Sequence, residues 1–147
     1  MQDQSAHIAW RDGDLPVSTR FDDPYFSLQG GLAETAHVFL QGNDLPARFR
    51  DGFHIAELGF GTGLNLLATL HLWRETGQTG QLRFTTFEAY PMTAEDMRRA
   101  QSAFPSLARI AAPDPSEVGE HCSLVTGSEI IGAFMMSSRE YSVWNCA

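Results

Sequence analysis

The sequence predicts one α/β domain built on a parallel sheet, and three consecutive features lead to that prediction. The first is a short apolar strand that ends in an acidic residue, Glu57, just before a glycine-rich turn. The second is a helix over residues 64–74, whose leucines and Trp73 recur with helical spacing. The third is a β-branched and aromatic strand over residues 82–87, followed by Glu88. A strand, a glycine turn, a helix and a second strand form the βαβ half-unit of a doubly wound sheet.

The turn after the first strand has the chemistry of a nucleotide-cofactor site. Gly59 and Gly61 let the backbone turn freely and approach a ligand closely. A dinucleotide fingerprint would need its third glycine at position 64, where Leu64 stands, and a P-loop would need a lysine that is not there. The remaining pattern, E-x-G-x-G-x-G from Glu57 to Gly63, resembles motif I of class I S-adenosylmethionine-dependent methyltransferases. That resemblance implies a Rossmann-like fold of this class.

S-adenosylmethionine suits this loop because it carries no phosphate and therefore needs no anion-binding lysine. Its methionine end has an ammonium and a sulfonium, which a nearby carboxylate favours, so Glu57 would face the ammonium or hold the loop. Glu88 ends the next strand, where an acid can bind both ribose hydroxyls; alone it would be a solvated strand end, and its pairing with the loop favours the ribose role. Asn65 is a further candidate, although a first-turn amide is more often a helix cap. The predicted cofactor-binding residues are therefore Glu57, Gly59, Gly61, Gly63, Asn65 and Glu88.

The segments on either side of this unit divide the chain into three parts. Residues 1–52 form an N-terminal extension, with a β-hairpin around an Asp-Gly turn and a short helix over residues 31–40. Pro16 predicts that the second arm of the hairpin lies at a sheet edge. Residues 53–112 hold the first part of the cofactor domain, including a helix capped by Thr93 whose arginines read as a solvated face. Residues 113–147 are a tail without a clear period.

Composition limits the class of protein. The chain has 147 residues and a formal net charge of −8, which argues against a free-standing nucleic-acid binder. Its two cysteines, Cys122 and Cys146, read as free thiols of a reducing compartment, and the five histidines do not cluster at metal-ligand spacing. The polar start lacks a leader pattern and no apolar run reaches membrane-spanning length. We expect a cytoplasmic protein without a membrane partner or a metal.

Five segments of the chain match the motifs of one family, in that family's order. They are residues 21–27 (FDDPYFS), 31–35 (GLAET), 38–43 (VFLQGN), 57–65 (ELGFGTGLN) and 87–88 (FE). Together they resemble the methyltransferase domain of the tRNA wobble-uridine enzymes of the MnmC/MnmD family, over roughly residues 8–110. The resemblance implies methylation of the amine of 5-aminomethyl-2-thiouridine at the wobble position of tRNA, with S-adenosylmethionine as cofactor. It also implies tRNA as a partner, bound through regions that are largely absent from this chain, and a fused or separate FAD-dependent oxidoreductase domain. It places Tyr25 near the cofactor; a core aromatic is the alternative for Tyr25.

The resemblance ends after about residue 112. The acidic loop that lies at the active site in the family has no counterpart here, so we name no catalytic residue. We expect residues 113–147 to reflect a truncated or frameshifted reading, which leaves a partial domain. Two alternatives of other classes are a non-catalytic cofactor-binding remnant and a fragment of a nucleotide-dependent oxidoreductase.

Overall fold

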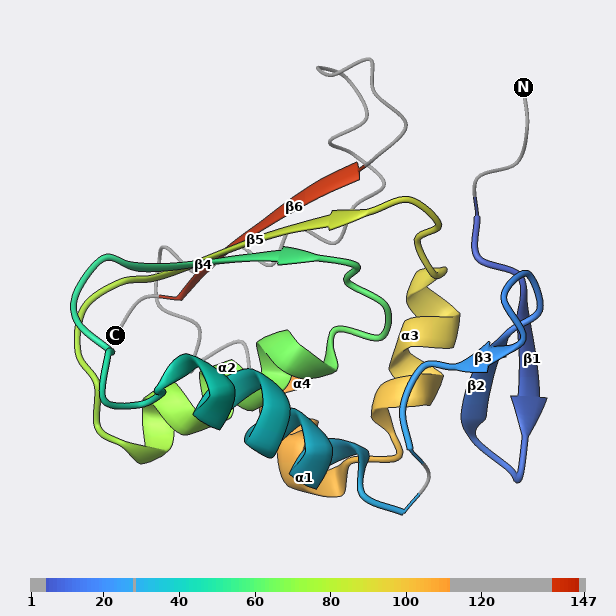
Figure 1. Ribbon diagram of the computed structural model, residues 1–147, viewed down its shortest axis with the longest axis horizontal. Coiled ribbons are helices and arrows are strands. Elements are labelled where there is room, and N and C mark those ends of the chain that lie inside the picture. The colour runs from blue at the N-terminus through green and yellow to red at the C-terminus, as the bar shows by residue number, and fades with distance from the viewer. Residues whose placement is uncertain (1–4, 28, 112–138, 146–147) are drawn as a thin grey trace.

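The computed structural model describes residues 5–27, 29–111 and 139–145, and within them the fold is mixed α/β (Figure 1). The larger sheet has the strand order β4 (Phe53–Leu58), β5 (Leu82–Glu88), β6 (Arg139–Asn145). Strands β4 and β5 run parallel, and helix α2 (Leu64–Glu75) connects them. The predicted βαβ unit is therefore confirmed. Strand β6 pairs with β5 in the antiparallel sense, so this sheet is not purely parallel.

Strand β6 lies in the segment that the sequence left unassigned. Its seven residues pair with all of β5, from Leu82↔Asn145 to Glu88↔Arg139. The sequence assigned no element to residues 139–145, and the structure has this strand there. The rest of the predicted tail, with Cys122 and Cys146, falls outside the described residues.

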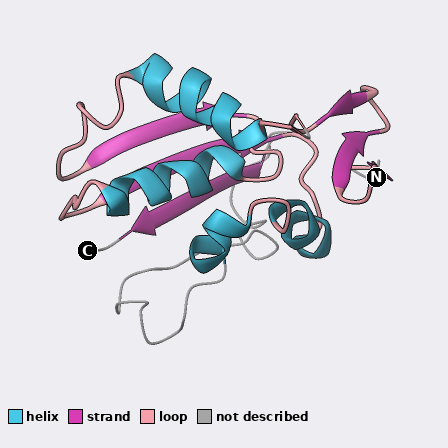
Figure 2. Ribbon diagram, turned by 90° about the horizontal axis from the view of Figure 1, so that it is seen from below, coloured by secondary structure: helices cyan, strands magenta, loops and turns pink. Residues whose placement is uncertain are grey.

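Helices cover one face of the larger sheet. Helices α1 (Gly31–Thr35), α2 and α4 (Ala108–Ala111) lie on the same side of β4 and β5 in Figure 1, and Figure 2 shows the helices against the sheet from below. Strand β4 alternates accordingly, because Phe53 and Glu57 are buried whereas Leu58 is 87% exposed. This period of two places the Glu57 side chain on the helix-covered face.

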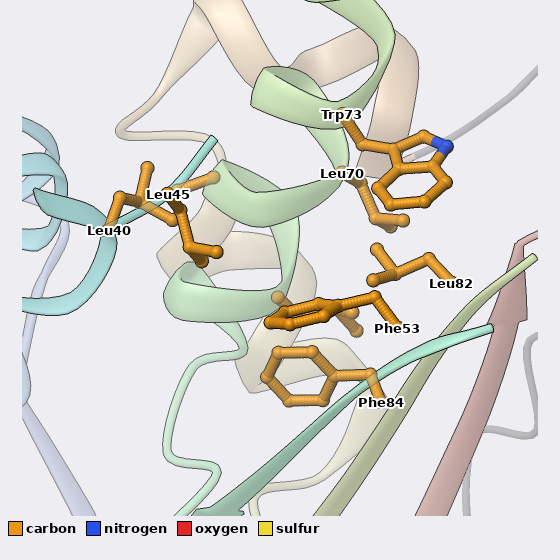
Figure 3. Packing of buried hydrophobic residues seen from close by; sticks show 9 residues of the cluster. Leu40, Leu45, Phe53, Leu70, Trp73, Leu82 and Phe84 are labelled. Atoms are coloured by element: carbon orange, nitrogen blue, oxygen red, sulfur yellow. The ribbon is translucent and has the colours of Figure 1, made fainter. Parts of the chain in front are cut away.

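The core between α2 and the sheet holds the start of that helix in place. Its members are buried apolar side chains from the strands, from α2 and from the segment before β4, namely Leu40, Leu45, Phe53, Leu66, Ala68, Leu70, Trp73, Leu82 and Phe84 (Figure 3). Trp73 is 2% exposed, and its ring meets that of Phe49 edge to face at 4.9 Å. Burial of such side chains contributes roughly 1.5–3 kcal/mol each, so this contact surface fixes α2 against β4 and β5.

The predicted N-terminal hairpin is present as β1 (Ile8–Arg11) and β2 (Leu15–Ser18), paired antiparallel. A third strand, β3 (Asp23–Pro24), pairs with the other side of β2. The edge position expected for Pro16 was therefore wrong. A proline lacks only a donor, and the Pro16 carbonyl accepts a hydrogen bond from the Tyr25 N–H at 3.0 Å.

Helix α3 (Ala94–Gln101) anchors this hairpin. It begins as predicted, with the Thr93 hydroxyl accepting a hydrogen bond from the Asp96 N–H at 3.1 Å. Arg99 then donates to Asp14 and to the Gly13 carbonyl, each at 2.9 Å, and its guanidinium lies 4.1 Å from the centre of the Trp10 ring. The expectation that Arg99 belongs to a solvated helix face was therefore wrong, because Arg99 binds the hairpin.

The predicted short helix over residues 31–40 is less regular than expected. It begins as α1, continues as a π-turn, η1 (Ala36–Leu40), and closes with a 3-10 turn, η2 (Gln41–Asn43). Asp44, at φ 56°, ends it in the left-handed conformation. Within the described part of the chain, no helix is long and apolar enough to cross a membrane.

Candidate functional site

The glycine loop between β4 and α2 adopts a backbone that suits glycine. Gly59, Gly61 and Gly63 have φ values of 87°, 55° and 76°, all in the left-handed region. A Cβ atom on Gly63 would lie 2.8 Å from the Phe60 ring, and one on Gly61 would lie 3.2 Å from the Tyr25 ring. The loop therefore needs glycine both for its conformation and for its close approach to two aromatic rings.

Glu88 joins this loop to the end of β5. Its Oε2 atom accepts a hydrogen bond from the Gly61 N–H, and its Oε1 atom accepts one from the Tyr90 N–H, both at 2.9 Å. Glu88 thus lies beside the loop, as the sequence predicted. A carboxylate has about four lone-pair positions, so both oxygens keep acceptor capacity for a ligand's hydroxyl groups.

Glu57 is a buried acid, 7% exposed, at the base of the loop. Its Oε1 atom accepts a hydrogen bond from the Asn65 side-chain amide at 2.9 Å, which ties β4 to the first turn of α2. Among the described residues, Oε2 has no hydrogen-bond partner, and neither has the buried hydroxyl of Thr86, the residue that pairs with Glu57 across the strands. Burial of a carboxylate oxygen without a hydrogen-bond partner costs free energy. A cation or a hydrogen-bond donor near this oxygen would reduce that cost.

The environment of Glu57 disfavours its charged form. Burial raises the pKa of the Glu57 carboxyl above its ordinary value of 4.5, and the Glu88 carboxylate adds to the rise. The Asn65 amide opposes that rise. The Thr86 hydroxyl lies close enough to lower the pKa as well, although it does not reach hydrogen-bond geometry.

Asn65 and Tyr25 complete the predicted set. Asn65 does not cap α2, whose N-cap is Gly63, so the capping alternative was wrong for this residue. The Tyr25 ring lies against Gly61, which brings the small N-terminal sheet to the glycine loop. Burial, and secondarily the Glu88 carboxylate, raise the pKa of the Tyr25 hydroxyl, whereas the Ser18 side chain lowers it.

A cleft of about 830 Å³ lies over the loop. Five of the predicted residues line it, namely Tyr25, Gly59, Gly61, Asn65 and Glu88. The other two, Glu57 and Gly63, do not line it, and Glu57 is connected to the lining through its hydrogen bond with Asn65. Among the described residues that line the cleft there are three carboxylates, Asp23, Glu34 and Glu88, and no lysine or arginine. The cleft therefore favours cationic or neutral ligands over phosphates.

Sequence reasoning missed four further residues that line the cleft. Phe21, Asp23 and Glu34 line the cleft from the N-terminal part, and Tyr90 lines it from the loop after β5. The aromatic and acidic composition of residues 21–27 was the available signal for two of them. Within the residues described, no group of three histidine, cysteine, aspartate or glutamate side chains is placed to hold a metal ion.

The sequence of the chain is similar to those of several known proteins. No protein-family model matches it. It is 48% identical over 116 residues to a protein of Aeromonas hydrophila called tRNA 5-methylaminomethyl-2-thiouridine biosynthesis bifunctional protein MnmC, and the match covers 74% of this chain. Proteins of the same name from Vibrio cholerae and Hahella chejuensis are 45% identical over 72% of the chain and 41% identical over 82% of it. The chain belongs to the MnmC family.

The match covers only a segment of each MnmC protein. It corresponds to 17% of the length of the Aeromonas hydrophila and Vibrio cholerae proteins and to 21% of that from Hahella chejuensis. The name of these MnmC relatives describes a bifunctional protein that takes part in the biosynthesis of a modified tRNA nucleoside.

Proposed function

We propose that this chain is the S-adenosylmethionine-binding part of an MnmC-type enzyme. The reaction would be methylation of the amine of 5-aminomethyl-2-thiouridine at the wobble position of tRNA. The methylamino group in the name of the relatives is the product that such a transfer forms. The observation that carries the proposal is a cleft that combines a glycine loop with an acidic lining. The proposed fold is accordingly the Rossmann-like fold of class I methyltransferases.

The charges of the cleft fit this cofactor better than a dinucleotide. NAD and FAD carry a pyrophosphate, which would face Glu88 and the other lining carboxylates without a basic side chain among the described lining residues. Like charges at about 4 Å repel by roughly 1–4 kcal/mol at the surface of a protein. The sulfonium and ammonium groups of S-adenosylmethionine would instead be attracted to the same carboxylates.

The contacts of the glycine loop, Glu88 and Glu57 suggest how each would bind the cofactor or support its site. The loop from Gly59 to Gly63 lets the backbone approach the ligand without side-chain interference. Glu88, fixed by two backbone N–H groups, would accept hydrogen bonds from the ribose hydroxyls. Glu57, which is buried and does not line the cleft, would hold the loop through the bond of its Oε1 atom to Asn65, and its carboxylate would attract the ammonium group electrostatically. The bound cofactor would supply the methyl group.

The acceptor amine is protonated in water and must lose its proton before transfer. The acidic lining, which includes Asp23 and Glu34, would attract the ammonium form into the cleft. Holding donor and acceptor in line would supply much of the acceleration, because well-oriented reactants react as though at very high concentration. No catalytic residue is assigned.

The proposed partners follow from the reaction. tRNA would be the substrate, and the reaction would take place in the cytoplasm. Since the relatives are called bifunctional and are several times longer, we also propose a fused or separate FAD-dependent oxidoreductase domain as the second activity.

Calorimetric titration with S-adenosylhomocysteine, FAD and NADH tests the proposal directly. We expect binding of S-adenosylhomocysteine near one to one and none of the two dinucleotides. Binding of FAD or NADH instead would favour an oxidoreductase fragment and overturn the proposal. Transfer of labelled methyl groups to tRNA that carries 5-aminomethyl-2-thiouridine then separates an enzyme from a non-catalytic cofactor-binding remnant.

A further inference from the structure

We propose that Phe21, with Arg20 and Tyr90, forms a stacking site for a nucleobase of single-stranded RNA at the cleft. The inference rests on the proposed function, because it names where the RNA acceptor would bind. Phe21 is 62% exposed although it is a large apolar side chain, and it lines the cleft together with Tyr90. An exposed aromatic side chain held at the edge of a cleft is typical of a binding surface.

The turn that carries Phe21 is fixed rather than loose. The Thr19 N–H donates to the His7 carbonyl at 3.0 Å, and the Phe21 N–H donates to the Ser18 hydroxyl at 3.3 Å. Asp22 has a φ of 49°, in the left-handed region that aspartate adopts more readily than most residues other than glycine, and Arg11 pairs with its carboxylate at 3.0 Å. A ring that is already held in place loses little conformational freedom when a ligand stacks on it.

Two segments far apart in the sequence bring the aromatic groups together. The rings of Phe21 and Tyr90 meet edge to face, with centres 5.9 Å apart. The Arg20 guanidinium lies 4.4 Å from the centre of the Tyr90 ring and 5.8 Å from that of Phe21. Unstacked RNA bases bind to aromatic rings and to the planes of arginine side chains in this kind of arrangement.

The stacking site is connected to the proposed cofactor site. The backbone N–H of Tyr90 donates to Glu88, and the other carboxylate oxygen of Glu88 binds the Gly61 N–H of the glycine loop. A base that stacks on Phe21 would therefore lie beside the wall of the cleft that carries the loop. A substituent on that base could reach the cleft without the phosphate backbone entering the acidic lining.

The experiment uses a single-stranded seven-nucleotide RNA with 2-aminopurine at its centre, because the fluorescence of this base falls when it stacks on an aromatic ring. We expect the wild-type chain to quench the fluorescence in a saturable way. The Phe21→Ala variant should bind about 5- to 100-fold more weakly, as expected for the loss of one stacked base. Phe21→Leu should lose the quenching as well, since it keeps apolar volume without a ring. Leu58→Ala is the matched control, because it removes an exposed apolar side chain that does not line the cleft.

Titration of the same variants with S-adenosylhomocysteine separates the possible failures. The proposal predicts that Phe21→Leu leaves this affinity unchanged. An equal loss of S-adenosylhomocysteine affinity would mean that Phe21 contacts the adenine of the cofactor, which overturns the proposal. Wild-type protein that binds S-adenosylhomocysteine but does not quench the RNA also overturns it and leaves the proposed function intact. No binding of S-adenosylhomocysteine by the folded wild type would reject the proposed function itself.

Discussion

The carboxylate of Glu88 accepts a hydrogen bond from the backbone N–H of Gly61 at 2.9 Å, across 27 positions of sequence. The contact closes the βαβ unit at the end where its two parallel strands finish, because Glu88 ends β5 and Gly61 follows β4. Its other oxygen binds the Tyr90 N–H, so one side chain orders the loops after both strands. In open α/β sheets this end of the strands is where ligands bind.

Replacement of Glu88 tests its role in ligand binding. We expect Glu88→Ala to weaken the binding of S-adenosylhomocysteine by about 1–3 kcal/mol, as for the loss of a charged hydrogen-bond acceptor. Glu88→Gln should lose less, because its amide oxygen can still accept from Gly61. Calorimetry on variants whose circular dichroism matches the wild type provides the measurement. Unchanged affinity in Glu88→Ala would remove this residue from the site.

The glycine loop makes a prediction about stability. Gly63→Ala combines a left-handed backbone with a close contact to the Phe60 ring, whereas Gly13→Ala has a left-handed backbone and nothing within 4 Å. Backbone strain alone costs about 1–2 kcal/mol, and overpacking adds about 1–3 kcal/mol. Urea unfolding should therefore show the larger loss of free energy of unfolding for Gly63→Ala. Equal losses would mean that Phe60 moves aside without cost.

The parts of the fold that depend on local pattern were predictable from the sequence. The glycine turn between an apolar strand and a helix with regularly spaced leucines indicates β4, α2 and β5, and Thr93 marks the start of α3. Strand β6 was missed because its seven residues do not show a clear alternation of apolar and polar side chains. Its pairing partner, β5, lies more than 50 positions earlier in the sequence.

The contacts that complete the site join segments that no local pattern relates. Glu88 could be placed beside the loop, because strand ends of a parallel pair lie together, but its bonds to two backbone groups could not be foreseen. The meeting of Phe21 with Tyr90 depends on how the small sheet packs against the rest of the chain. That packing depends in part on Arg99 and Asp14, which are 85 positions apart.

Arg99 provides a test of how the hairpin is anchored. It is half-exposed, so its ion pair with Asp14 is weak by itself, but it also binds the Gly13 carbonyl and lies over the Trp10 ring. We expect Arg99→Ala to lower the free energy of unfolding by about 1–2 kcal/mol and to speed hydrogen exchange in β1 and β2. Arg98→Ala, on the same helix, is the matched control and should change it by less than about 0.5 kcal/mol. An equal effect of both variants would contradict the anchoring role.

The buried carboxyl of Glu57 predicts a particular dependence of stability on pH. Burial first, and then the Glu88 carboxylate, raise the pKa of Glu57 in the folded state above its ordinary value of 4.5. The folded state therefore holds this proton more tightly than the unfolded state. The resulting stabilisation is fully present below the unfolded pKa and is lost as the pH rises through the folded pKa.

Glu57→Gln isolates this effect, because the glutamine oxygen can still accept from Asn65 but cannot ionise. We expect the stability of Glu57→Gln relative to the wild type to increase between pH 4 and pH 7, since only the wild type must then hold a buried charge. Urea unfolding at several pH values measures this difference, with the exposed Glu75→Gln as control. A difference that stays constant with pH would show that Glu57 ionises in the folded protein as readily as in the unfolded chain. A cation bound near Glu57 would lower its folded pKa, so saturating S-adenosylmethionine should diminish the pH dependence.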